Sequence, residues 1–166
     1  MEMKTPAQPA QYSASDIASY FIWKAENEGL KITNKKLQKL LYYSQAWHLV
    51  FNDGKPLFGE DIEAWVHGPV VRNVYNFFKK FGFMPITLKN ISNPVDSQKT
   101  LFLDQIWSVY GGFDAEYLEM LTHREKPWQD ARRDIESKER SNTVIDLNDM
   151  RNFYQNKLDV SEAKYS

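Results

Sequence analysis

Hydrophobic residues recur at helical spacing in two consecutive segments near the start of the chain. Between Ser13 and Glu28 the apolar positions share one face, and Ser13 with Asp16 has the spacing of a capping box. The second segment, residues 34–51, follows Thr33, whose hydroxyl suits a helix N-cap. It is apolar around most of its circumference, which is typical of a buried helix. We therefore predict two helices, the second of which lies at the centre of the domain.

The pattern changes in the next part of the chain. Side chains alternate between two faces over residues 62–67, which predicts a short strand. Pro69 then suits the first position of a third helix, because this position needs no backbone N–H. We expect that helix to extend to Phe81 and to stop at Gly82.

The second half of the chain contains four more segments with helix start signals. These are a segment from Ser97 to about Tyr110, one after Asp114, one that begins at Pro127–Trp128, and one from Asp146 to about Leu158. Residues 143–145 are short and β-branched, so we expect them to pair with the strand near residue 64. The predicted fold class is mainly α: a compact single domain of about six to seven helices around a buried central helix, with a small β element.

The predicted domain covers residues 13–158. Residues 1–12 are polar and contain two prolines, so we expect a flexible N-terminal tail there. Residues 159–166 are expected to form a flexible C-terminal tail. The segment 83–97 has no helical period and is expected to be irregular.

Composition narrows the possible functions of the 166-residue chain. The net charge is -1, whereas a strongly basic nucleic-acid-binding domain would carry a large positive charge. The chain has no cysteine, so disulfides, thiolate metal sites and a cysteine nucleophile are excluded. Its beginning lacks the apolar core of a signal peptide, and no run approaches the ~18 apolar residues of a membrane span. We expect a cytoplasmic protein that does not associate with membranes.

The residue pattern contains no convincing catalytic constellation. The three histidines, His48, His67 and His123, have no spacing typical of a metal site. Ser44 and His48 lie one helical turn apart and could contact each other, but no third group to orient the imidazole is visible. A buried polar pair explains them better. We therefore predict no catalytic residues, no metal and no cofactor.

Large aromatic and basic side chains point away from the predicted core. Tyr20 and Trp23 project from the polar side of the first helix, and Arg72, Asn76 and Lys79 from the polar side of the third. Aromatic residues and arginine are common in binding hot spots, so these five are our candidate partner-binding residues. The basic side of the third helix also leaves nucleic acid as an alternative partner, although with weak support.

The chain resembles a known family over several spaced motifs. The matching pieces are Leu37-Gln38-Lys39-Leu40-Leu41-Tyr42, Trp47-His48-Leu49, Pro56-Leu57-Phe58, Glu63-Ala64-Trp65, Gly68-Pro69-Val70, Leu121-Thr122-His123-Arg124-Glu125 and Pro127-Trp128. Together they are similar to the SocA-like, or Panacea, domain, which includes the GepA-like phage-associated proteins. We expect the motif residues to be structural, with residues 62–75 as a joint at which Trp65 and Trp128 pack near the central helix beside His48 or His67. The structural signature is Trp47, His48, Trp65, Gly68, Pro69, His123, Pro127 and Trp128.

The resemblance implies an antitoxin module of the kind carried on prophages and other mobile genetic elements. Such a module neutralises a cognate toxin, encoded nearby, by direct protein–protein binding. It implies a non-enzymatic role and no cofactor. The alternatives are a DNA-binding regulator of its own operon and an adaptor that delivers the toxin to a protease.

Overall fold

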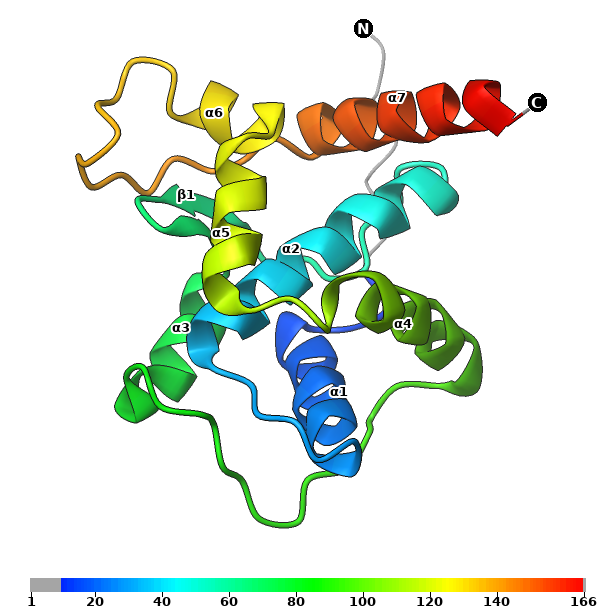
Figure 1. Ribbon diagram of the computed structural model, residues 1–166, viewed down its shortest axis with the longest axis vertical. Helices are drawn as coiled ribbons and strands as arrows, with labels where there is room; N and C mark the ends of the chain where they lie inside the picture. The colour runs from blue at the N-terminus through cyan, green and yellow to red at the C-terminus, as the bar shows by residue number, and fades with distance from the viewer. Residues whose placement is uncertain (1–9, 166) are drawn as a thin grey trace, which may run out of the picture.

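A computed structural model describes residues 10–165. Within this range the chain forms seven α-helices, one short 3-10 helix and a two-stranded sheet (Figure 1). The elements are α1 (Ala14–Asn27), α2 (Asn34–Phe51), β1 (Glu63–Trp65), β2 (Gly68–Val70), α3 (Arg72–Phe78), η1 (Lys79–Phe81), α4 (Ser97–Tyr110), α5 (Ala115–His123), α6 (Lys126–Ala131) and α7 (Leu147–Tyr165). The predicted fold class, a mainly α domain with a small β element, is confirmed.

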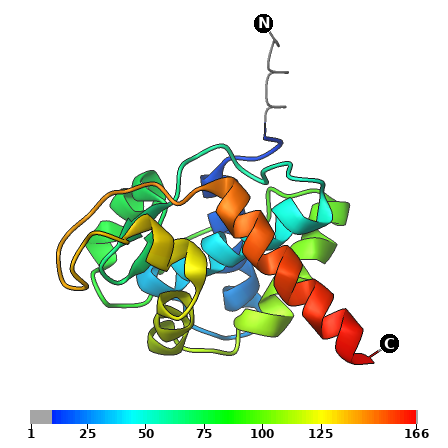
Figure 2. The ribbon, with the colours of Figure 1, turned by 90° about the horizontal axis from the view of Figure 1, so that it is seen from above.

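Helix α2 is the centre of the fold. It contacts α1, α3, α4, α5, α7 and β2, and Figures 1 and 2 show it passing through the middle of the domain with α7 lying across it. Residues on every side of α2 are buried, from Leu37 and Lys39 to Tyr43 and Leu49. The helix therefore has little contact with water, as its apolar circumference predicted.

Local capping interactions set the beginnings of the helices. The hydroxyl of Ser13 and the carboxylate of Asp16 form the predicted capping box of α1. The Thr33 hydroxyl accepts the Lys36 N–H at the start of α2, and the Asp114 carboxylate accepts the N–H of Tyr117 at the start of α5.

The sheet corrects the prediction for Pro69. Strands β1 and β2 form an antiparallel hairpin in which Pro69 lies opposite Ala64, so Pro69 belongs to a strand and α3 begins only at Arg72. The missing N–H of Pro69 leaves no gap in the ladder, because Ala64 and Pro69 exchange no hydrogen bond: the Ala64 N–H donates to Thr143 O at 2.8 Å, and Pro69 O accepts from Lys39. Ile145 N donates to Ile62 O at 2.8 Å on the same side, so the predicted pairing of residues 143–145 with this strand is confirmed.

The expectations for the last helix and for the N-terminal tail have different outcomes. Helix α7 continues to Tyr165, so the predicted end of the last helix at Leu158 was wrong. Residues 1–9 of the expected N-terminal tail lie outside the described residues, and Tyr12 forms a β-bridge with Phe58. Between residues 10 and 165 no helix is long and apolar enough to cross a membrane.

Candidate partner-binding surface

The motif residues converge inside the domain around Lys39 of α2. The Lys39 side chain is fully buried, and its Nζ donates to Pro69 O of β2 at 3.3 Å. Burial lowers the pKa of Lys39 to about 7. Gly68 has φ +108°, and a Cβ there would lie 2.5 Å from Lys39 Cε and 3.1 Å from the Thr122 hydroxyl of α5. This close approach of three motif segments explains why glycine occupies position 68.

Two of the three motif tryptophans, Trp65 and Trp128, meet where the hairpin contacts α6. Trp128 is buried, and its indole Nε1 donates to the carbonyl oxygen of Trp65 at 2.9 Å. The ring stacked on Trp128 is His123, at 4.1 Å between ring centroids, and not His48 or His67 as expected. The guanidinium of Arg132 lies on the Trp128 ring and donates to Ala64 O at 2.8 Å, which ties α6 to β1.

His48 and Ser44 do not contact each other as a nucleophile and base would. The Ser44 hydroxyl donates to the Leu40 carbonyl at 2.7 Å, which is a bond within α2. His48 lies between the Lys55 carbonyl and the Lys99 ammonium, each at 2.7 Å. Burial, with Lys99 nearby, lowers the pKa of His48 to about 4, so the ring is neutral near pH 7.

A buried carboxyl group, which the sequence did not reveal, lies beside α2. Glu125 accepts hydrogen bonds from the hydroxyls of Tyr43 and Tyr154, and Lys157 lies 3.6 Å away at the edge of the cluster. Burial raises the pKa of Glu125 above its ordinary value. These bonds join α2, the N-cap residue of α6 and α7, so the group belongs to the interior. At the edge of the cluster, Trp47 donates its indole N–H to the Tyr110 hydroxyl at 2.8 Å.

The five candidate partner-binding residues lie in different environments. Tyr20 is fully buried and donates its hydroxyl to Asp104 of α4, so it is not part of any surface. Trp23 is partly buried against the core. Arg72 is exposed, but its guanidinium already forms two hydrogen bonds with Glu63, at 2.9 and 2.7 Å. Asn76 and Lys79 are exposed on α3 and η1.

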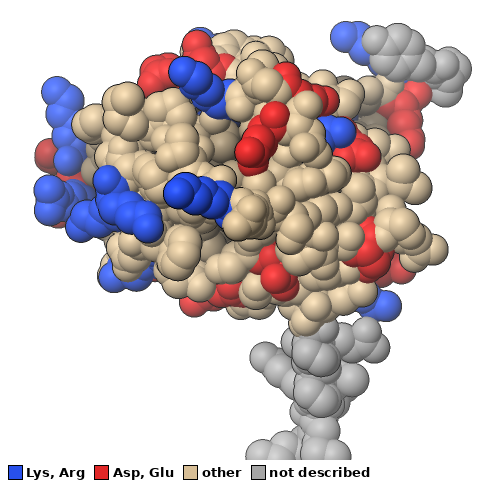
Figure 3. Space-filling model, turned by 90° about the horizontal axis from the view of Figure 1, so that it is seen from below, with Lys and Arg blue, Asp and Glu red and all other residues tan. Residues whose placement is uncertain are grey.

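The exposed apolar side chains that follow Asn76 were missed by the sequence interpretation. Phe77 is 64% exposed, Phe83 is 96% exposed and Met84 is 68% exposed, in a segment that also carries Lys79 and Lys80. Figure 3 shows basic side chains gathered at one side of the face seen from below, next to a broad area without charged side chains. Exposed apolar side chains that lie together are candidates for an interaction site, whereas single ones, which also occur elsewhere on this protein, are normal.

The acidic and imidazole side chains do not gather into a metal-binding group. Among the described residues, no set of three His, Asp or Glu side chains is placed to hold a metal ion. Glu119 is instead engaged by Lys35 at 2.6 Å and by His67 at 2.8 Å. These interactions join α5 to the start of α2 and to the turn of the hairpin.

A buried cluster of motif residues and an exposed apolar and basic surface together characterise a small, mainly α module. The chain belongs to the antitoxin SocA-like, Panacea domain family, whose model matches residues 37–129. It is similar to antitoxin SocA of Caulobacter vibrioides (strain NA1000 / CB15N), with 38% identity over 74 residues. That match spans 45% of this chain and 39% of the relative's length. No solved structure matches the chain.

Proposed function

We propose that the protein is an antitoxin that neutralises a cognate toxin, encoded nearby, by direct contact through the exposed segment of residues 76–84. The observation that carries the proposal is the exposure of Phe77, Phe83 and Met84 beside Lys79 and Lys80. Family membership supports the antitoxin role, and the relative's name, antitoxin SocA, agrees with it.

The division between interior and surface supports this choice of contact segment. The motif residues Lys39, Gly68 and Trp128 are buried and have partners within the domain. They therefore serve the fold, and recognition of a particular toxin is left to exposed side chains. Aromatic side chains that must leave water on binding dominate protein interfaces, and Phe77 and Phe83 are well placed for that role.

The proposal is tested by growth of bacteria in which each neighbouring reading frame is induced alone and then together with this protein. We expect one frame to arrest growth, this protein to restore it, and the two proteins to co-purify. If no neighbour is toxic, or if growth is restored without any complex, the proposal is wrong. Toxin abundance measured in the same cultures separates blocking from delivery to a protease, because delivery lowers abundance.

A regulator that binds DNA is the competing function, since Lys79 and Lys80 are exposed on the same segment. Binding to phosphate should weaken steeply as salt rises. The assay is a gel shift with the promoter DNA of the operon at low and high salt. Salt-sensitive binding that requires both lysines would favour the regulator, whereas a toxin complex without DNA binding favours the antitoxin.

A further inference from the structure

The segment Phe81–Met84 forms a ridge whose backbone is held in place. Gly82 closes η1 by donating its N–H to Lys79 O at 3.0 Å, and Met84 N donates to Phe81 O at 2.9 Å. Directly after the ridge, Ile86 N donates to Ile32 O at 2.8 Å, which fixes this part of the chain against the connection between α1 and α2. The exposed side chains of Phe83 and Met84 therefore stand on a turn that is anchored by backbone hydrogen bonds.

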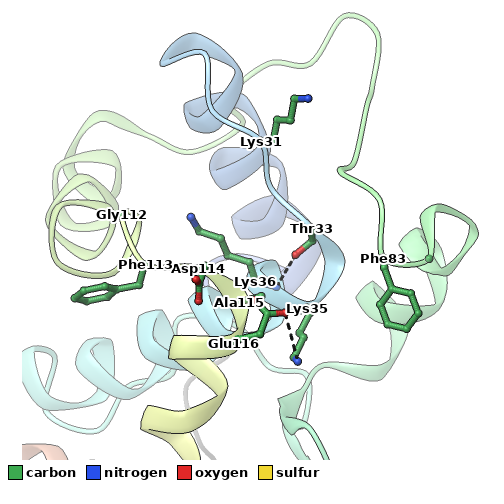
Figure 4. Close-up of a pocket in the computed structure, with 11 residues that line it drawn as sticks. Lys31, Thr33, Lys35, Lys36, Phe83, Gly112, Phe113, Asp114, Ala115 and Glu116 are labelled. Atoms are coloured by element: carbon green, nitrogen blue, oxygen red, sulfur yellow. Dashed lines mark hydrogen bonds and ion pairs between the residues drawn. The ribbon is translucent and has the colours of Figure 1, made fainter.

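Two hollows lie on either side of the ridge. The first has a volume of about 330 Å³ and lies between the start of α2, the ridge and the turn from α4 to α5. Figure 4 shows Phe83 and Phe113 on opposite sides of this hollow, with side chains from the start of α2 between them. The second hollow, of about 520 Å³, is more apolar and is lined by Leu30, Phe81, Met84, Pro85, Ile86 and Leu88 among others. Lys31 borders both hollows.

Five lysines lie around the ridge and its hollows, Lys31, Lys35, Lys36, Lys79 and Lys80, against three carboxylates, Glu26, Asp114 and Glu116. Among the described residues, Lys31, Lys79 and Lys80 have no carboxylate within ion-pair distance, and neither does Lys36 at the floor of the first hollow. Lys36 instead donates to the Gly111 carbonyl at 2.5 Å and lies over the Trp107 ring. The hollow also contains two carboxylates, but each of them is already engaged.

The two carboxylates of the first hollow are used within the protein. Asp114 caps α5 by accepting the N–H of Tyr117 at 2.8 Å. Glu116 lies 4.0 Å from the ammonium of Lys35. Asp114 partly offsets the charge of Lys36 and Glu116 that of Lys35, and both carboxylates would repel a polyanion that tracked the hollow. This arrangement favours a protein partner with separate carboxylates over a continuous phosphate backbone.

We propose that the ridge and its two hollows bind an acidic segment of the toxin, whose apolar side chains enter the hollows while its carboxylates face the lysines. This rests on the proposed function and adds the chemistry of the partner. Apolar side chains leave water on both sides of the contact, and the complementary charges set its orientation and accelerate the encounter.

The first test needs no toxin. The full-length protein is titrated with a synthetic peptide that alternates glutamate and leucine, and separately with a matched peptide in which lysine replaces glutamate. Binding is detected by shifts of the backbone amide signals in NMR spectra. We expect the acidic peptide to shift the amides of residues 31–36 and 82–84, and the basic peptide to leave them unchanged. Equal effects of both peptides, no shifts with either, or shifts confined to another surface would overturn the proposed chemistry.

The second test uses the toxic neighbour identified by the growth assay. Its Kd is measured with wild-type protein, with F83S, with K31E/K79E, and with the control K138E/K164E, whose two exposed lysines lie outside the ridge. We expect F83S and K31E/K79E each to raise the Kd at least about tenfold, and the control to leave it unchanged. K31E/K79E should also reduce the dependence of the Kd on salt.

The outcomes separate this inference from the proposed function. If the wild type binds the toxin and both ridge variants, folded by circular dichroism, bind it equally well, neither the ridge nor the segment 76–84 is the contact, although the antitoxin role stands. If the ridge variants instead lose binding to a single-stranded DNA probe that the wild type holds, the ridge is a nucleic-acid surface and the inference is wrong.

Discussion

The buried Lys39 side chain should make the stability of the domain depend on pH. Burial is the main cause that lowers the pKa of Lys39 from 10.5 to about 7, with Glu119 opposing the shift and Lys35 adding to it. Lysine in the unfolded chain keeps the ordinary pKa, so between these two values the unfolded state binds more protons than the folded state. The free energy of unfolding therefore rises with pH in this window, and the stability is lost as pH falls from 10.5 towards 7.

The size of the effect follows from the two pKa values. From about pH 7 to about pH 9 the unfolded state binds on average ~0.85 more protons at this site, which at ~1.36 kcal/mol per pH unit amounts to about 2 kcal/mol. Replacing Lys39 with methionine keeps most of the stem and removes the titrating group. Burial also lowers the pKa of Lys36 and Lys99, so a smaller rise should remain in that variant.

The assay is urea unfolding followed by tryptophan fluorescence at about pH 7 and about pH 9. The wild type should gain about 2 kcal/mol or somewhat more between the two, and K39M should gain about 2 kcal/mol less than the wild type. K138M, at an exposed lysine, should behave as the wild type does. A wild type whose stability does not change over this range, or a K39M variant with the full rise, would refute the reasoning.

Two further predictions concern the packing of the motif residues and are measured by the same unfolding assay near pH 8. G68A should destabilise the domain by about 3 kcal/mol, because the new methyl group combines a strained backbone with a 2.5 Å approach to Lys39. The control G29A, at a glycine with positive φ but open space around it, should cost only about 1 kcal/mol. Equal costs of the two substitutions would show that the close approach to Lys39 is unimportant. W128F should lower the free energy of unfolding by about 1 kcal/mol through the lost hydrogen bond to the Trp65 carbonyl. W128A should lower it by about 4 kcal/mol because it leaves a cavity. A W128A protein as stable as the wild type would place the ring outside the core.

Local signals in the sequence were enough for most helix boundaries. The capping box at Ser13 and the cap at Thr33 act within one turn, so neighbouring residues determine them. Pro69 misled the prediction because its requirements are met equally by a first helical turn and by a strand position that needs no N–H. Which of the two occurs depends on the pairing of β2 with β1, and β1 in turn pairs on its other edge with residues 143–145, a contact far away in the sequence.

The surface was harder to predict than the interior. Tyr20 lies on the polar side of α1, yet Asp104 of α4 covers it and accepts its hydroxyl, a contact that no local pattern reveals. The motif segments could be recognised as a set, but their meeting at Lys39 depends on the tertiary fold. Phe83 lies in an irregular segment, where hydrophobic periodicity gives no information about which side chains remain exposed.

The central claim is that this protein neutralises its toxin by binding it through the ridge Phe81–Met84. The most direct measurement is calorimetric titration of the purified toxic neighbour with wild-type protein and with F83S, with growth rescue scored for the same two proteins. The account predicts saturable binding and rescue by the wild type, and a loss of both in F83S while its thermal unfolding is unchanged. Full rescue by an F83S protein that binds as tightly as the wild type would contradict it.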